Sequence, residues 1–227
     1  MEQLLRLNNL ESTAHLNRLI DSDLIHEINQ KKHSIDYFNS AQEKVINFRL
    51  PLNFPLLTAN DISKYISNIP KNPLSLLIIL IQAGSASLGF FEHGKLVHHK
   101  VIKKYMVRKK QGKAQIYYLN EKGKSRAGSR VRLANTYDFF EEINQKLHDW
   151  NALPERILYS CPIKLWNLVF ESKVDSFFEK TDERLLKIPR DVQTPNFEEL
   201  KRISIFAGFG HLTIFGNIKI EELIKKK

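Results

Sequence analysis

Cysteine is nearly absent from this sequence of 227 residues, which contains Cys161 alone. One thiol cannot form an internal disulfide, and it cannot supply a zinc site made of cysteines only. Cys161 follows Ser160 without the flanking glycines of a nucleophile elbow, so we expect it to be a buried structural thiol. The cysteine content fits a reducing compartment, and we expect a cytoplasmic location.

Long apolar runs are missing as well. The most apolar stretch, residues 74–81, is much shorter than the roughly 20 residues that a membrane-spanning helix needs. The segment after Met1 is acidic and polar, whereas a secretory signal begins with basic residues followed by an apolar run. We therefore expect no association with a membrane.

Acidic residues are too few to balance the basic ones. Asp and Glu total 25 against 35 Lys and Arg, which gives a formal net charge of +10 and an isoelectric point near 9.6. A field of this sign attracts polyanions, so nucleic acid is the first partner to consider. Hydrophobic residues make up 42% and charged residues 26% of the chain, which is the composition of an ordinary globular protein.

The first 73 residues differ in pattern from the rest. Apolar residues at helical spacing between Leu16 and Ile28 predict a helical arm or hairpin over residues 1–47. Four prolines between residues 51 and 73 then leave room for one short helix, which Asn60 or Asp61 can cap. We expect residues 1–73 to form a helical N-terminal arm and connector, and residues 74–227 to form one further domain.

Strand patterns begin at residue 74. Apolar or alternating stretches at residues 74–81, 87–91 and 95–103 are separated by the turn signals Gly84 and His93-Gly94. Three consecutive strands with short turns predict an antiparallel meander. The next stretch, residues 108–132, is poor in apolar residues and is expected to be a long charged loop, a kind of loop that is usually functional or disordered.

Helices and strands alternate after this loop. Asn135 or Thr136 is a candidate cap for a helix that reaches Trp150 and carries one apolar face. Strands are expected at residues 157–160, 185–188 and 212–215, and a helix is expected with Thr194 as its cap and Pro195 at its first position. The order of elements predicts an α+β fold, with helices packed on a mixed sheet from which the long basic loop emerges.

Much of the excess positive charge lies between residues 100 and 132. Glu121 is the single acid in this stretch. The basic residues are Lys100, Lys103, Lys104, Arg108, Lys109, Lys110, Lys113, Lys122, Lys124, Arg126, Arg130 and Arg132. A cluster of this density favours contacts with phosphates that weaken as salt rises. A solvated basic face without a partner is the alternative interpretation, although Gly112, Gly123 and Gly128 indicate a backbone freedom that such a face does not require.

The segment resembles a known family in its local sequence. Residues 109–115 read Lys-Lys-Gln-Gly-Lys-Ala-Gln and residues 125–129 read Ser-Arg-Ala-Gly-Ser. These stretches, with the strands before them and the helix after them, resemble the Vms-like release-factor (VLRF) family of bacterial type. That family is related to the central, RNase H-like domain of archaeal and eukaryotic class I peptide release factors. The resemblance covers about residues 74–215.

The resemblance implies a site and a reaction. Gln115 takes the place of the family's catalytic glutamine, and Gly112 permits a close approach of backbone to RNA. Arg108, Lys109, Lys110, Lys113, Lys122, Lys124, Arg126, Arg130 and Arg132 are the implied nucleic-acid-binding residues. The implied partners are peptidyl-tRNA and the rRNA of the large ribosomal subunit. The implied reaction is release of the nascent peptide from stalled or split ribosomes, by peptidyl-tRNA hydrolysis or by cleavage near the tRNA 3′ end, without a cofactor.

Two departures from the family pattern leave an alternative open. The paired glycines of the family become Gly112-Lys113, and Ala114 replaces a serine or other small residue before the glutamine. A catalytically inactive ribosome-binding or tRNA-binding factor that uses the same loop is therefore the second hypothesis. A nuclease of RNase H type is a third, but the expected strands carry no clustered carboxylates for its metals. His93, His98 and His99 have no carboxylate or cysteine at a metal-ligand spacing near them, so we expect no metal site.

Overall fold

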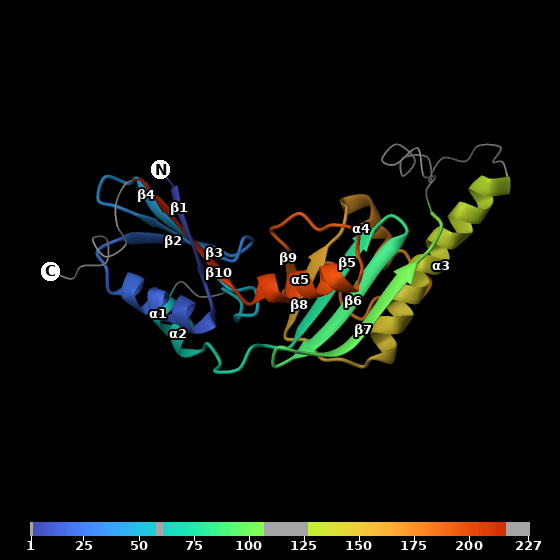
Figure 1. The fold of residues 1–227 in the computed structure, drawn as a ribbon, viewed down its shortest axis with the longest axis horizontal. Coiled ribbons are helices and arrows are strands. Elements are labelled where there is room, and N and C mark those ends of the chain that lie inside the picture. Colours follow the sequence, from blue (N-terminus) through green and yellow to red (C-terminus); the bar gives the residue numbers. More distant parts are fainter. Residues whose placement is uncertain (1, 58–60, 107–126, 217–227) are drawn as a thin grey trace. The chain divides into compact units, whose positions relative to one another are not determined.

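The computed structural model describes residues 2–57, 61–106 and 127–216, with the side chains of residues 127–130 left out of the description. The chain divides into two compact units. The first comprises residues 1–74 together with residues 203–227, and the second comprises residues 75–202. Figure 1 labels the helices and strands of both units.

The first unit contains a five-stranded antiparallel sheet. In spatial order its strands are β1 (Glu2–Leu7), β10 (Gly210–Phe215), β4 (Lys44–Arg49), β3 (Ser34–Phe38) and β2 (Ile25–Asn29). The strand β10 pairs with β1 on one side and with β4 on the other. The sheet is therefore completed by a strand from near the other end of the sequence.

Two helices contribute to the core of this unit. They are α1 (Asn9–Ile20) and α2 (Ile62–Ser67). Leu16 and Leu19 of α1 and Tyr65 of α2 share one buried cluster with apolar residues from the sheet. Each helix begins with a side-chain cap, in which Asn8 accepts from the backbone N–H of Glu11 and Asp61 accepts from that of Lys64. The predicted cap of the short helix is thus confirmed at Asp61.

The expected helical arm over residues 1–47 corresponds to one helix and four strands. The helical spacing of Leu16 and Leu19 is real and lies in α1, but the same reading does not continue into residues 25–49. Ile46 and Phe48 are alternate, buried residues of β4, and β-branched and aromatic side chains of this kind are typical of strands. Their partners in β10, Ile214 and Leu212, lie at the other end of the described chain, so local periodicity could not reveal the sheet.

The second unit contains a mixed five-stranded sheet. Its spatial order is β7 (Lys95–Lys103), β6 (Ser85–Glu92), β5 (Leu76–Gln82), β8 (Arg156–Ser160) and β9 (Leu185–Lys187). The first three strands form the predicted antiparallel meander, and β8 and β9 are added in parallel orientation. The α+β fold with a mixed sheet is confirmed.

Helices cover both faces of this sheet. Phe139, Phe140 and Ile143 of α3 (Ala127–Asp149) and Leu165 of α4 (Ile163–Phe170) share a buried cluster with one set of alternating strand residues. On the opposite face, the Leu200 side chain of α5 (Phe197–Ala207) lies against Gly89, where a Cβ would come within 2.7 Å of it. Strand residues alternate between faces, which explains why β6 can present small residues to α5 and apolar ones to α3.

Two predicted helix starts are corrected by the structure. The helix α3 begins at Ala127, so Asn135 and Thr136 lie inside it, and Thr136 donates to the Arg132 carbonyl at 2.8 Å instead of capping. Good helix formers with charged side chains, such as Arg132, can extend a helix beyond its apolar face. The apolar periodicity therefore placed the start of the helix too late. The helix α5 begins at Phe197, and Asn196 is its cap, because the Glu199 backbone N–H donates to Asn196 Oδ1 at 2.8 Å.

Two general properties of the described residues bear on function. Among the helices that the structure describes, none is long and apolar enough to cross a membrane. Within the same residues, no group of three or more His, Cys, Asp or Glu side chains is arranged to hold a metal ion.

Candidate functional site

Most of the predicted site falls in one segment between β7 and α3. Gln115, Arg108, Lys109, Lys110, Gly112, Lys113, Lys122, Lys124 and Arg126 lie outside the described residues. Arg130 belongs to α3, and its side chain is also outside the description. Arg132 is described, and its side chain is 7% exposed within the fold. We therefore describe the parts of the fold at the two ends of residues 107–126.

The first end of the segment is the short stretch of residues 104–106, which we call the stem. It follows β7 directly, and the Lys104 backbone N–H donates to the Gly84 carbonyl at 3.1 Å. Gly84 occupies the turn between β5 and β6 with φ of +80°, a conformation that glycine adopts without strain. The stem is thus attached to the turn of the neighbouring hairpin.

The stem is also attached to the helix that follows the segment. The side-chain amide of Asn135 in α3 donates to the Tyr105 carbonyl at 2.9 Å. The next residue, Met106, is 2% exposed and belongs to the main buried cluster of the second unit. The chain therefore enters the segment from a fixed position and returns from it along a helix anchored to the same place.

Lysines near the stem are partly neutralised by one carboxylate. Glu142 of α3 faces β7, and its two oxygens lie 3.8 Å from Lys100 Nζ and 3.1 Å from Lys104 Nζ. Glu142 lies in the interior of α3 and pairs across to β7 and the stem. Lys103 is exposed on the same strand. The positive charge available at this end of the sheet is smaller than the count of basic residues indicates.

Two of the histidines for which no metal site was expected, His98 and His99, take part in ring contacts. His98 stacks between Phe90 and Trp150, with centroid distances of 6.4 and 5.6 Å. His99 lies 4.6 Å from the Phe197 ring on the other face of β7. These contacts give the imidazoles a packing role in the sheet.

Cys161 has the properties expected of a structural thiol. It is 8% exposed and belongs to the core of the second unit. Burial raises its pKa to about 12, so the thiolate needed for nucleophilic attack is not formed near neutral pH. The prediction of a buried thiol is confirmed.

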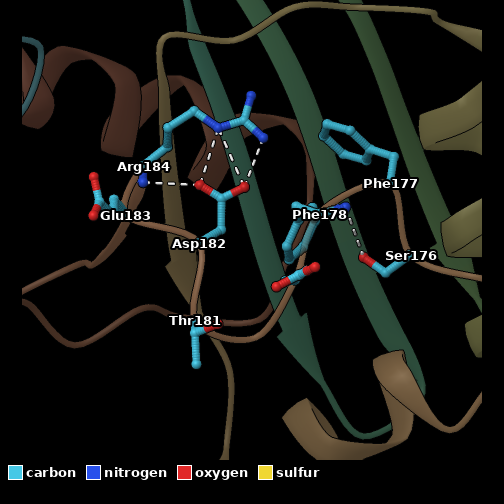
Figure 2. A pocket seen from close by; sticks show the side chains of 8 residues that line it. Ser176, Phe177, Phe178, Thr181, Asp182, Glu183 and Arg184 are labelled. Atoms are coloured by element: carbon cyan, nitrogen blue, oxygen red, sulfur yellow. Dashed lines mark hydrogen bonds and ion pairs between the residues drawn. The ribbon is translucent and has the colours of Figure 1, made fainter.

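A hollow lies on the segment between α4 and β9. It has a volume of about 560 Å³ and is lined by residues from Ser176 to Arg184. Figure 2 shows the Asp182 carboxylate facing the Arg184 guanidinium, with contacts of 2.6–3.2 Å. The hydrogen bond from Arg184 lowers the pKa of Asp182, which keeps the carboxylate ionised and engaged. Asp182 and Arg184 bind each other and hold this segment of the chain, so we assign the hollow no chemistry.

The described geometry defines a class of protein. A meander of three strands leads into a basic segment, a long helix returns from that segment and packs on the sheet, and parallel strands and a closing helix follow. This is the order that the resemblance to release-factor domains implies. The Bacteroidetes VLRF1 release factor family matches residues 76–207, and the chain belongs to that family.

Two curated proteins are also similar to this chain. The chain is 27% identical over 158 residues to tRNA endonuclease vms-1 of Caenorhabditis elegans, which covers 67% of this chain and 25% of that protein. It is 30% identical over 139 residues to tRNA endonuclease ANKZF1 of Homo sapiens, which covers 59% of this chain and 19% of that protein. The chain thus spans a quarter or less of the length of these relatives.

A solved structure titled Vms1 mitochondrial localization core is also similar. The alignment covers 87% of this chain and 80% of the other, with a TM-score of 0.46 and 11% sequence identity.

Proposed function

We propose that this protein releases nascent peptides from peptidyl-tRNA on stalled or split ribosomes, as part of ribosome-associated quality control in the cytoplasm. The observation that carries the proposal is the family match, which brackets the segment containing Gln115. The similar curated proteins are named tRNA endonucleases, which supports chemistry at a tRNA. The bond that is broken is either the ester between peptide and tRNA or a phosphodiester near the tRNA 3′ end.

Gln115 is the proposed catalytic residue. A neutral amide is a poor proton acceptor, so its contribution is to orient the attacking water or ribose hydroxyl and to stabilise the developing oxyanion. Gly112 would let the backbone approach RNA closely. The flanking residues Arg108, Lys109 and Lys110 would bind phosphates and hold the tRNA end in register.

The described ends of the segment support a positioned reactive residue. The stem before the segment is attached to Gly84 and to Asn135, and Met106 is buried in the core. Residues that act by orientation must be held to a fraction of an ångström, and sites supported by strands and helices are more precise than sites on loops alone. The attachment of the stem to a sheet and a helix is consistent with this requirement.

A catalytically inactive tRNA-binding or ribosome-binding factor is the second candidate. Lys113 and Ala114 stand where the family has glycine and a small residue or serine before the glutamine. Both changes restrict the backbone more than glycine does. In this function the basic residues act alone and Gln115 contributes little.

Peptide release from purified peptidyl-tRNA on large ribosomal subunits tests the two candidates. We would compare the wild type with Gln115→Ala and with the double variant Lys109→Glu/Lys110→Glu, and determine whether the tRNA 3′ end remains attached to the peptide. We expect Gln115→Ala to bind normally and to lose roughly 100-fold or more in release rate, as on removal of an oxyanion-stabilising group. The charge reversals should weaken binding, most strongly at low salt.

The outcomes separate the candidates. If the wild type binds but releases nothing, or if Gln115→Ala is as active as the wild type, the catalytic function is wrong and the binding function is the better account. If Gln115→Ala abolishes release and still binds, the catalytic function stands, and the product formed by the wild type identifies the bond that is broken.

A further inference from the structure

The turn between β5 and β6 touches the stem with unusually little space. A Cβ at Gly84 would lie 2.5 Å from the Lys104 carbonyl oxygen, a distance that real Cβ contacts do not show. The obstructing atom belongs to the backbone, so a side chain at residue 84 can be accommodated only if the stem and the turn move apart. Glycine is therefore favoured at position 84 for two reasons: the positive φ of the turn and the close approach of the stem.

A second layer of hydrogen bonds fixes this turn. Gln82 Nε2 donates to the Val192 carbonyl at 2.9 Å, and Ser85 Oγ donates to the Pro195 carbonyl at 2.7 Å. The turn residues on either side of Gly84 are thus tied to the chain that leads into α5. Both side chains act on backbone carbonyls, which hold a position more rigidly than flexible side chains do.

The chain before α5 is itself fixed by a buried carboxylate. Glu199 is 4% exposed, accepts from the Gln193 backbone N–H at 2.8 Å and pairs with the Arg202 guanidinium. Contacts therefore run without interruption from α5 through residues 192–195 and the turn to the stem. The Asn135 amide completes the arrangement from the α3 side.

We propose that Gly84 and Asn135 are positioning residues for Gln115, and that they act by fixing the stem from which the segment leaves the sheet. This inference rests on the proposed catalytic function of Gln115. Neither residue needs to touch RNA. Gly84 sets the stem by leaving room for the Lys104 carbonyl, and Asn135 sets it by holding the Tyr105 carbonyl.

Asn135→Asp is the sharpest variant, because it keeps the shape of the side chain and removes its donor. The bond to Tyr105 is exposed, so its loss should change the unfolding temperature little. Gln145→Glu is the matched control on the same helix, since Gln145 Nε2 makes an equally exposed bond of 3.0 Å to Asp149. Asn135→Gln keeps an amide donor and should retain more activity than Asn135→Asp.

The first measurement is a distance that does not depend on activity. Spin labels are attached at Gln115→Cys and at Lys187→Cys, on the exposed side of β9, in a full-length Cys161→Ala background. Pulsed electron paramagnetic resonance then gives the distribution of distances between the labels. We expect Asn135→Asp and Gly84→Ala to shift or broaden that distribution, and Gln145→Glu to leave it unchanged.

The second measurement is peptide release by the same unlabelled variants. We expect Asn135→Asp to lower kcat on the order of tenfold with KM unchanged, because small misplacements of an orienting group have large effects on rate. Gln145→Glu should remain within twofold of the wild type. A merely structural role for Asn135 would instead lower the unfolding temperature and leave the ratio of kcat to KM as it is.

An unchanged distance distribution in both Asn135→Asp and Gly84→Ala would overturn the positioning role, whatever the activity. A changed distribution with unchanged kcat in a protein that requires Gln115 would overturn it as well. If the distribution changes but Gln115→Ala releases peptide like the wild type, the stem is fixed as described and the proposed catalytic function fails instead.

Discussion

The two sheets of this chain are assembled in different ways. In the second unit, β5, β6 and β7 follow one another directly, and their hairpins need only short turns. In the first unit, β1 and β10 are paired although one lies near the start of the sequence and the other near residue 215. One sheet is therefore built mainly from neighbours in sequence and the other depends on a pairing that spans almost the whole chain.

The difference coincides with the bounds of the family match. The family match covers residues 76–207, which include every strand of the second sheet and none of the first. The stem and its attachments to Gly84 and Asn135 also lie in the second unit. The proposed chemistry thus belongs to the unit with the locally connected sheet, whereas β10 (Gly210–Phe215) pairs with β1 and β4 in the other unit.

The largest expected loss of stability follows from removing one buried aromatic ring from the core of each unit. Phe139 in the second unit and Phe48 in the first are both fully buried. Each change to Ala should cost about 3–5 kcal/mol, through lost burial and the cavity left behind. Hydrogen exchange should show that Phe139→Ala lowers protection mainly in β5–β7 and that Phe48→Ala lowers it mainly in β3, β4 and β10. Equal loss in both units from either variant would show that the sheets unfold as one body.

A smaller effect is expected from crowding the strand that completes the first sheet. A Cβ at Gly210 would lie 2.6 Å from Ser12 Oγ and 3.0 Å from the Phe48 ring. Gly210→Ala should therefore destabilise the first unit by about 1–3 kcal/mol, as overpacking usually does. Gly208→Ala is the control, because its nearest contact would be an ordinary 3.6 Å. Denaturant unfolding measures both, and equal midpoints would contradict the tight packing of β10.

An acid-dependent effect should distinguish the second unit. The hydrogen bond from Arg202 lowers the pKa of Glu199. A carboxyl whose folded pKa is depressed stabilises the protein above its unfolded pKa, and this contribution is lost as the pH falls through the folded value. Glu199→Gln should cost about 1.5 kcal/mol at pH 7, the typical value of a hydrogen bond to a charged group. As the pH falls through the lowered folded pKa of Glu199, the variant and the wild type should converge, and a constant difference across the pH range would contradict this linkage.

The smallest effect is expected at the ion pairs between α3 and β7. Glu142 and both of its lysine partners are between 31% and 42% exposed. Glu142→Gln should lower the free energy of unfolding by less than about 1 kcal/mol at low salt. The difference should vanish near 1 M salt, where screening is nearly complete. A larger, salt-independent loss would mean that Glu142 has a packing role that its exposure does not indicate.

Sequence patterns located the strands of the second unit to within a few residues because each strand pairs with its neighbour and is bounded by turn signals. The expected strand at 95–103 is β7, and Gly84 and Gly94 do adopt the positive φ of turn residues. The pattern could not locate α4, because its eight residues are mostly apolar and an apolar run of that length fits a buried strand as well as a short helix. Nor could it find the role of Asn135, which a local reading assigned to a helix cap.

The sequence by itself determined the charge, the single thiol, the meander with its basic segment and the family to which the chain belongs. These properties depend on residue types and on short-range spacing, which are fully visible in one dimension. Only the tertiary structure decided that β10 completes the first sheet, that Arg132 is buried and that Gly84 and Asn135 hold the stem. Each of these features depends on contacts between residues far apart in the chain. Such contacts form only once the fold brings the partners together, so they produce no periodic pattern in the local sequence.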